Sequence, residues 1–465
     1  MSGTDENAIN SANENYMLRA LELAAFGTGH TLPNPVVGAV IVKDGRIIGE
    51  GYHRAYGGLH AERNALASVS DDPSGADMYV TLEPCDHHGK TPPCTEAIIG
   101  SGIKRVFIGS PDPNPKVRGK GIEHLRREGI EVVTDVLRGK CDDLNRLFFR
   151  HIQTGLPYVC MKYAMTADGK TATKTGGSKW ISNEESRGIV HEMRREYPAI
   201  MAGVNTVIED DPMLNCRLKN GMMNGPVYAY PPVSEDDRNA IALSCAGNPG
   251  KDYTAETVHP VRIICDSSLR LPKDCNIVKT AKDIPAFAAC AIPGLPEGIL
   301  VKAGLDEKNA DVYQLRYPGL VTSMSDDKRA EDKVFEQGDQ KKEDDKELSV
   351  SRDVLKRLQI LKDSGVGIIN TSCKGKTDLG KLAGILGGAG IAGILLEGGG
   401  TLNYSALEAG IVNEVYMFIG SKIFGGTAKT PVMGEGVELV HEAFDLRLQT
   451  VTPAGDDVMV RYAVE

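Results

Sequence analysis

The residues best suited to chemistry lie between positions 60 and 94. One alanine separates His60 from Glu62, and Cys85 and Cys94 follow later in the chain. One imidazole and two thiolates supply three ligands for a zinc ion and leave a fourth position for water, as in catalytic zinc sites. Zinc lowers the pKa of that water toward neutrality. Glu62 could then carry a proton from the water to a ring nitrogen and a leaving amine.

The order of these residues is typical of zinc-dependent deaminases. Such enzymes carry an H-x-E motif followed by P-C-x-x-C. Here the second motif is Pro84-Cys85, followed by the spacer DHHGKTPP before Cys94. The long spacer restricts which deaminase families the chain can belong to, and it does not weaken the prediction of a metal site. The pattern therefore predicts hydrolytic removal of an amino group from a small pyrimidine-type ring.

A purely structural zinc site is an alternative interpretation of these residues. It would need a fourth ligand, and His87 or His88 could supply one. The expected placement favours catalysis, because His60 should open a helix and Cys85 should follow a strand. The C-terminal end of a strand beside a helix N-terminus is where α/β proteins form their sites, and a helix N-terminus also favours the thiolate.

The elements around these residues alternate between helix and strand. Apolar spacing predicts a helix over 14–26, and Asp44-Gly45 predicts a hairpin turn between strands 35–42 and 46–50. A short helix should follow the HAE motif. Further strands are expected at 78–82, 105–108 and 130–133, and further helices at 95–101 and 119–128. This alternation predicts a largely parallel sheet with helices on both faces, which ends near residue 145.

A second α/β unit is expected in the rest of the chain. Its predicted strands cover 159–165, 199–204, 261–266, 367–370, 393–398 and 414–420, with a helix over 183–196. Two segments, 219–258 and 285–350, interrupt the pattern. We expect both to be peripheral loops, because long surface insertions cost little stability. Within the second, residues 325–348 contain ten acidic and six basic residues, which predicts a solvated segment with no packed core.

Composition and charge disfavour several classes of function. The net charge of −10 at pH 7 weighs against a nucleic-acid substrate, because an acidic protein repels phosphate polymers. The sequence contains no apolar run long enough for a transmembrane helix, and its polar N-terminal segment lacks a signal-peptide pattern. We therefore expect a cytoplasmic protein without membrane contact. Apart from Cys85 and Cys94, the cysteines occur singly, which predicts buried thiols in a reducing compartment.

Several long motifs occur in the order of one known family. They are TLPNPVVGAVIV, HRAYGGLHAE, TLEPCDHHGKTPPC and DPNPKVRGKGI, followed by KYAMTADGKTATKTGGSKWISNEESR, MAGVNTVIEDDPMLNCR and LLEGGGTLNYSALEAG. Together they resemble the bifunctional riboflavin biosynthesis deaminase/reductase family. The resemblance covers nearly the whole chain apart from the two interrupting segments. It implies a cytidine-deaminase-like three-layer α/β/α domain over 1–148 and a dihydrofolate-reductase-like α/β domain over 149–465.

The resemblance also implies two consecutive reactions. The first is zinc-dependent hydrolytic deamination of 2,5-diamino-6-ribosylamino-4(3H)-pyrimidinone 5′-phosphate. The second is NADPH-dependent reduction of the ribosyl chain to ribityl, which gives 5-amino-6-ribitylamino-uracil 5′-phosphate. A homo-oligomer, either a dimer or a tetramer, is implied as well. Carried over to this chain, His60, Cys85 and Cys94 would bind one zinc ion, Glu62 would be the proton donor, and Asn34, His53, His87 and Lys90 would line the deaminase pocket.

The reductase half is weakly diagnostic without the resemblance. The run GGGTL at 398–402 could present backbone N–H groups to phosphates, but it is not G-x-G-x-x-G, and by pattern alone it predicts a tight turn. The positions that match the family's NADPH contacts are Ala164, Trp180, Thr206, Asp210, Ser267, Gly399, Gly400, Thr401, Leu402, Asn403, Tyr404 and Ser405. Those that match its reductase substrate contacts are Lys162, Ser178, Arg194, Leu214, Arg217 and Glu397. The two arginines are suited to bidentate phosphate binding.

Three alternatives stay open on the sequence. A zinc deaminase acting on cytidine, guanine or a tRNA adenosine would carry the same HAE and PC elements. The GKTPPC spacer, the second domain and the acidic balance favour the riboflavin precursor instead. A non-catalytic protein would have a closed, four-ligand zinc site. In the third alternative, only one of the two halves is active.

Overall fold

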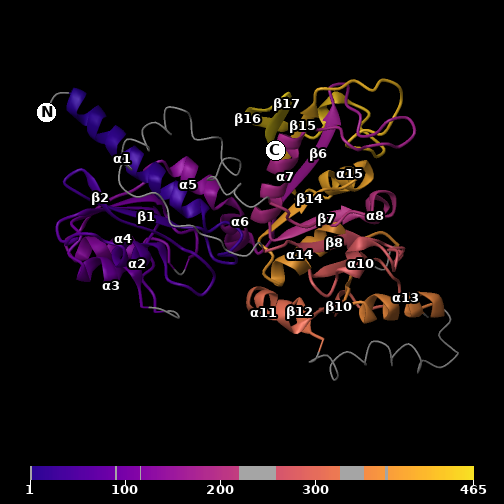
Figure 1. The fold of residues 1–465 in the computed structure, drawn as a ribbon, viewed down its shortest axis with the longest axis horizontal. Coiled ribbons are helices and arrows are strands. Elements are labelled where there is room, and N and C mark those ends of the chain that lie inside the picture. The colour runs from indigo at the N-terminus through magenta and orange to yellow at the C-terminus, as the bar shows by residue number, and fades with distance from the viewer. Residues whose placement is uncertain (1–2, 89–91, 116, 219–257, 325–349, 372–374) are drawn as a thin grey trace. The chain divides into compact units, whose positions relative to one another are not determined.

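The computed structural model describes residues 3–88, 92–115, 117–218, 258–324, 350–371 and 375–465. The chain divides into two compact units, one that extends to Thr154 and one that contains Gly155–Leu218 and His259–Glu465. Each unit is built on a β-sheet with helices packed against it (Figure 1). Among the described residues, no helix is both long and apolar enough to cross a bilayer. Lys90, the charged segment 325–348 and nearly all of the 219–258 segment lie outside the described residues.

The first unit contains what we call the N-terminal sheet. Its strand order in the described residues is β2 (Arg46–Tyr52), β1 (Gly38–Lys43), β3 (Asp77–Leu82), β4 (Arg105–Ser110) and β5 (Glu131–Val133). The predicted hairpin turn is confirmed, since Asp44 and Gly45 have φ of 52° and 73°, as a type I′ turn requires. β1 is antiparallel to both of its neighbours, so the prediction of a largely parallel sheet holds only for β3, β4 and β5.

Helices cover both faces of the N-terminal sheet, as predicted. Val40 and Val42 of β1 pack with α1 (Gly3–Ala25) and α5 (Arg138–Leu144). The alternate residues Ala39 and Ile41 point to the opposite face, where they pack with α2 (Ala61–Ala67), α3 (Cys94–Gly100) and α4 (Lys120–Arg127). α6 (Arg146–Thr154) ends the unit. Because α2 and α3 share one face, the predicted metal ligands at their N-termini lie on the same side of the sheet.

The second unit contains what we call the C-terminal sheet, with ten strands in its described residues. Seven adjacent strands run parallel, while β10 at one edge and the β16–β17 pair at the other are antiparallel to their neighbours. The order is β10 (Gly298–Val301), β13 (Gly367–Asn370), β9 (Ala286–Cys290), β8 (Val261–Cys265), β7 (Ala199–Gly203), β14 (Gly393–Leu396), β6 (Tyr158–Thr166), β15 (Val412–Gly420), β17 (Asp457–Val464) and β16 (Leu446–Ala454).

The expectation that 285–350 is a peripheral loop is wrong for its first part. Residues Ala286–Cys290 form β9, which lies between β13 and β8 inside the sheet, and all five are buried. β10 extends the same sheet, and β11 (Ala303–Leu305) pairs with β12 (Val321–Ser323) beside α11 (Glu307–Arg316). A strand buried on both faces shows no apolar–polar alternation, and alanine has a low strand propensity. The run AFAAC therefore gave no strand signal.

Helices of the second unit pack against this sheet and complete its core. α8 (Val204–Asp210), α10 (Asn276–Lys279) and α13 (Arg352–Asp363) share one buried cluster with strands β7, β8, β9 and β13. The predicted helix 183–196 is confirmed as α7 (Glu184–Glu196), whose N-cap Asn183 accepts the Ser186 N–H. Among the described residues of this unit, the remaining helical elements are α14 (Leu379–Gly388), α15 (Gly400–Glu408) and a short 3-10 turn at Val440–Glu442.

Candidate active sites

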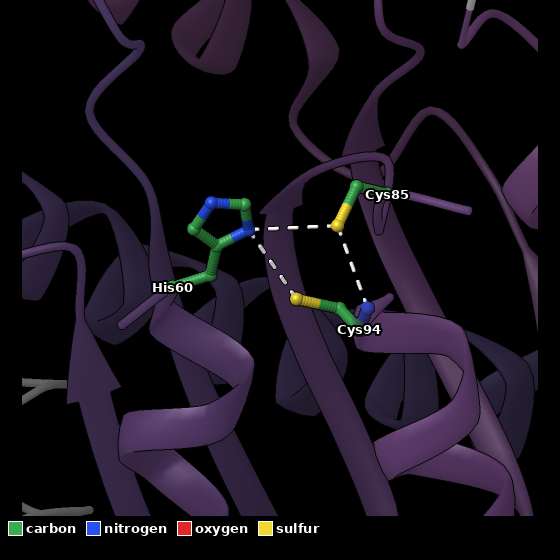
Figure 2. A group of neighbouring side chains, drawn as sticks. All are labelled: His60, Cys85 and Cys94. Carbon is green, nitrogen blue, oxygen red and sulfur yellow. Dashed lines mark hydrogen bonds between the residues drawn. The ribbon is translucent and has the colours of Figure 1, made fainter. Parts of the chain in front are cut away.

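The three predicted metal ligands converge in the first unit. His60 is the N-cap of α2, Cys85 follows β3, and Cys94 is the first residue of α3. Figure 2 shows their side chains pointing toward one another, with His60 Nδ1 lying 3.5 Å from Cys85 Sγ and 3.4 Å from Cys94 Sγ. All three donor atoms lie within 4.8 Å of one another. One strand end and two helix starts therefore present an imidazole and two sulfurs to a common point.

The start of α3 also favours a thiolate at Cys85. The Cys94 main-chain N–H donates to Cys85 Sγ over 3.4 Å, and unpaired N–H groups at a helix N-terminus attract negative charge. Hydrogen bonding with the Cys94 side chain, supported by His60, holds the pKa of the Cys85 thiol well below its usual range, to about 4. A deprotonated sulfur is the form that binds a metal ion.

The donor set fits a zinc ion with an open position. In the part of the chain that the structure describes, the group holds no fourth His, Cys, Asp or Glu ligand. His87 and His88, which the structural-zinc alternative would need, are both exposed, and His88 pairs with Glu96 at 3.2 Å. Three protein ligands with a vacant fourth position are typical of catalytic rather than structural zinc.

Glu62 lies in the first turn of α2, two residues after His60, and is 4 % exposed. Burial raises the pKa of its carboxyl, and the negative charge of Cys85 raises it further. A carboxyl with a raised pKa beside a metal site is suited to exchange protons near neutral pH. The role of Glu62 as a proton carrier stays a prediction.

Two acidic residues that the sequence analysis missed fix the loop at Cys85. The Glu83 carboxylate accepts main-chain N–H groups of four residues in 112–122, at 3.0–3.4 Å. Asp86 accepts the Thr95 hydroxyl at 2.6 Å and contacts His124 Nδ1 at 2.5 Å. The available signal was topological, because segments that follow neighbouring parallel strands such as β3 and β4 lie side by side.

Two of the four predicted pocket residues lie beside the metal ligands. Asn34 Nδ2 is 3.3 Å from His53 Nε2, and the His53 ring meets the His60 ring edge-on, with centroids 5.4 Å apart. Burial lowers the pKa of His53, which favours its neutral form. His87 is exposed. Asp112, which was not predicted, is half-buried, and this partial burial with the charges of Glu83 and Cys85 raises its pKa to about 6.

In the second unit, predicted reductase residues gather where four adjacent parallel strands end. Lys162 and Ala164 belong to β6, and Glu397 directly follows β14. Thr206 lies in α8 after β7, and Ser267 follows β8. These strands are neighbours in the order β8-β7-β14-β6. The carboxyl ends of adjacent parallel strands form the ligand-binding edge of α/β sheets.

Glu397 is the centre of a largely buried ion cluster, whose three side chains are 11–14 % exposed. Arg194 donates from Nε to Glu397 Oε1 at 2.6 Å and from Nη2 to Oε2 at 2.9 Å, and Lys162 Nζ lies 3.2 Å from Oε2. Burial opposes ionisation of this carboxyl, but the two cations outweigh it and hold its pKa far below the usual range. Arg194 therefore directs its paired N–H groups at Glu397, whereas the side chain of Arg217 is exposed and bonded to Asn215 Oδ1.

Several of the predicted NADPH contacts lie at the start of α15. Gly399 is its N-cap, and a Cβ on this glycine would lie 3.6 Å from Thr206 Oγ1, so α8 and α15 begin close together. Gly400 has no room for a side chain, since an added Cβ would lie 2.6 Å from Met433 Cγ. Asn403 is buried and donates to the Pro431 carbonyl oxygen at 2.8 Å. Of the remaining run, Thr401 is exposed, while Leu402, Tyr404 and Ser405 are half-buried.

The other predicted reductase residues differ in accessibility. Trp180 is 62 % exposed, with the Arg187 guanidinium 4.6 Å from its ring centroid. Ser267 Oγ lies 3.1 Å from Thr377 Oγ1. Leu214 is buried in the core cluster, so only its main chain could meet a substrate. Ser178 is half-buried and Asp210 is exposed.

Comparisons with known proteins cover both units. Residues 10–110 match the cytidine and deoxycytidylate deaminase zinc-binding region, and residues 157–292 and 314–460 match the RibD C-terminal domain. The riboflavin biosynthesis protein RibD of Actinobacillus pleuropneumoniae is 41 % identical over 97 % of this chain and 94 % of its own length. RibD of Escherichia coli is 32 % identical over 96 % of this chain and 98 % of its own length.

Solved structures agree with this assignment. A Thermotoga maritima diaminohydroxyphosphoribosylaminopyrimidine deaminase/5-amino-6-(5-phosphoribosylamino)uracil reductase superposes with a TM-score of 0.67. It is 30 % identical and covers 98 % of this chain and 99 % of its own. The two α/β units, the two family matches and the nearly full-length relatives lead to one conclusion: the chain belongs to the RibD family of bifunctional riboflavin biosynthesis deaminases and reductases.

Proposed function

We propose that this chain performs both reactions implied by its family, on one small phosphorylated pyrimidine. It deaminates 2,5-diamino-6-ribosylamino-4(3H)-pyrimidinone 5′-phosphate and then reduces the ribosyl chain of the product to ribityl. The observation that supports this most is the open three-ligand group of His60, Cys85 and Cys94 beside a buried Glu62. We assign the deaminase to 1–148 and the reductase to 149–465, in line with the two family matches.

In the deaminase half, the three donor atoms would hold one zinc ion. When bound, zinc supplies the Lewis acidity that makes water nucleophilic near neutral pH. Glu62 takes a proton from the attacking water and delivers it to the ring nitrogen. It then takes the remaining proton from the new hydroxyl group on the ring carbon and passes it to the amine, which leaves as ammonia. Asn34 and His53 would hold the pyrimidine edge, and their contacts with each other and with the His60 ring support this assignment. His87 and Lys90 would complete this pocket.

In the reductase half, NADPH would bind where α8 and α15 begin, and it supplies the hydride. The main-chain N–H groups at the start of α15 are suited to the cofactor's phosphates, and the lack of space beside Gly400 fixes the backbone there. The Glu397 carboxylate holds Lys162 and Arg194 in fixed positions beside the proposed substrate site. Arg217, with its exposed side chain, would meet the substrate phosphate. We assign no general acid to this step. A homo-oligomer and a cytoplasmic location stay predictions from the sequence.

A coupled turnover assay on the full chain tests the proposed function. Without NADPH, the authentic pyrimidinone phosphate should release one equivalent of ammonia. With NADPH, cofactor oxidation should begin only as the deaminated product accumulates. Zinc analysis of the same sample should give one ion per chain. Deamination of cytidine but not of the pyrimidinone phosphate would contradict the substrate assignment, and ammonia release without any NADPH oxidation would contradict the second activity.

A further inference from the structure

The short segment before Arg217 is bonded to α7 at three points. Arg194 Nη1 donates to the Asn215 carbonyl oxygen at 3.3 Å. The Cys216 thiol donates to the His191 carbonyl oxygen at 3.3 Å. The Arg217 main-chain N–H donates to His191 Nδ1 at 3.2 Å. His191 thus accepts two of these three hydrogen bonds, although neither the sequence pattern nor the family resemblance gave it a role.

His191 can accept the Arg217 N–H only while its Nδ1 carries no proton. Burial and the neighbouring Arg194 and Arg217 cations lower the pKa of this imidazole to about 4, and Lys162 acts in the same direction against the charge of Glu397. At neutral pH the ring is therefore uncharged. With Nδ1 as the acceptor, its single proton lies on Nε2. The hydrogen bond is thus available under all ordinary assay conditions.

Of the two arginines predicted to bind the substrate phosphate, only Arg217 has an exposed side chain, because the guanidinium of Arg194 is bonded to Glu397. The orientation of the Arg217 side chain therefore matters most. The Arg194 fork binds Glu397, while Arg217 extends from a segment without regular structure and is exposed. An arginine on such a segment must be held in place before it can bind a phosphate with two parallel hydrogen bonds. Asn215 Oδ1 holds the guanidinium end, and His191 holds the main-chain end.

We propose that His191 is a positioning residue of the reductase site, which fixes the main chain at Arg217 and so aims its guanidinium at the substrate phosphate. This inference rests on the proposed reductase function. It assigns to His191 no contact with the reacting carbon and no proton transfer. The predicted consequence is a loss of affinity for the phosphorylated substrate, with the chemical step and the NADPH site unaffected.

The test uses the full chain, the deaminated ribosylamino substrate and NADPH. His191→Leu removes the acceptor and should raise KM for this substrate about tenfold, the factor that corresponds to one lost hydrogen bond. The kcat and the KM for NADPH should stay near those of the wild type. The inhibition constant of inorganic phosphate, used as a competitive inhibitor, should rise by a similar factor. His191→Asn should recover most of the loss, because its Oδ1 can occupy the place of Nδ1.

Matched variants keep the test decisive. His441→Leu, at an exposed position in the 3-10 turn, should leave every constant unchanged. If His191→Leu does not fold, His191→Gln replaces it and should show the same rise, because its acceptor lies one bond farther from the main chain. Equal losses in the Leu and Asn variants, or an unchanged substrate KM, would overturn the inference alone. A wild-type chain that never oxidises NADPH would overturn the proposed reductase function itself.

Discussion

Each candidate site contains a glutamate with little solvent exposure, Glu62 in one half and Glu397 in the other, and the two environments shift its pKa in opposite directions. Glu62 is 4 % exposed, and burial with the Cys85 charge raises the pKa of its carboxyl. The Glu397 side chain is 11 % exposed, but two adjacent cations overcome the effect of burial and keep it ionised. The surroundings of a buried carboxyl, rather than its residue type, decide whether it carries a proton or a fixed charge.

The two sites also differ in what holds their side chains in place. The proposed deaminase ligands come from three separate elements, and a bound metal ion would fix their positions relative to one another. The reductase cluster is already closed by direct ion pairs between β6, α7 and the end of β14. The first site should therefore respond to metal, and the second to changes in charge.

Metal removal should have the largest effect, and it should affect the deaminase half alone. Treatment with a chelator such as dipicolinate should abolish deamination completely, because the three ligands then hold no Lewis acid. NADPH oxidation with pre-deaminated substrate should continue in the same sample, and added zinc should restore ammonia release. Loss of both activities together would show that the reductase half also depends on the metal.

Substitution of Glu62 by Gln should have the next largest effect. Deamination should fall by about 10²–10⁴-fold, the usual contribution of a positioned proton carrier, while zinc content stays at the wild-type level. Glu123→Gln on α4, at an exposed position, is the matched control and should keep full activity. Ammonia release measured beside metal analysis decides the result, and undiminished release in Glu62→Gln would rule out the proton-carrier role.

Substitution of Glu397 by Gln should destabilise the reductase half. Two buried cations would lose their shared partner, a change that costs about 3–5 kcal/mol in unfolding free energy. Urea unfolding followed by amide hydrogen exchange of β6, α7 and β14 reports on this half. Glu297→Gln breaks an exposed pair with Lys381 and should cost less than about 1 kcal/mol. Equal costs for the two variants would contradict the buried-cluster interpretation.

The smallest expected effect is a dependence of stability on pH at His191. Its pKa is about 4 in the folded chain against an ordinary value of 6.5. Between these values the unfolded chain binds the proton and the folded chain does not. The His191 contribution to stability should therefore be complete above pH 6.5 and decrease as the pH falls toward 4. Unfolding of the wild type and of His191→Asn across this range should show their stability difference shrinking, and a constant difference would contradict it.

The sequence predicted the metal site better than the reductase site for a physical reason. His60, Glu62, Cys85 and Cys94 lie within 35 residues, on elements whose order follows from local periodicity. The ion pair between Lys162 and Glu397 joins residues 235 positions apart, and only the strand order of the sheet brings them together. No local pattern encodes that order, so the resemblance supplied these residues without the contacts between them.

The secondary-structure predictions also succeeded where the signal was local and failed where it depended on long-range packing. Strands with clear turns or alternation, such as the hairpin at Asp44-Gly45, were predicted correctly. β9 was missed because its five buried residues are mostly small and show no alternation. Asp86 and Glu83 were missed as supports of Cys85, because their partners come from α3, α4 and the segment between β4 and α4. Their roles depend on packing that periodicity does not describe.

The position of β9 limits how the chain can be shortened for experiments. Deleting 285–350 as a unit would remove the strand between β8 and β13 and leave those two roughly 10 Å apart, twice the normal strand spacing. The main-chain hydrogen bonds of both would then lack partners inside a buried sheet. A shortened version of this chain should instead keep every element from β9 to β12, which ends at Ser323, and keep α13 together with its N-cap Ser351.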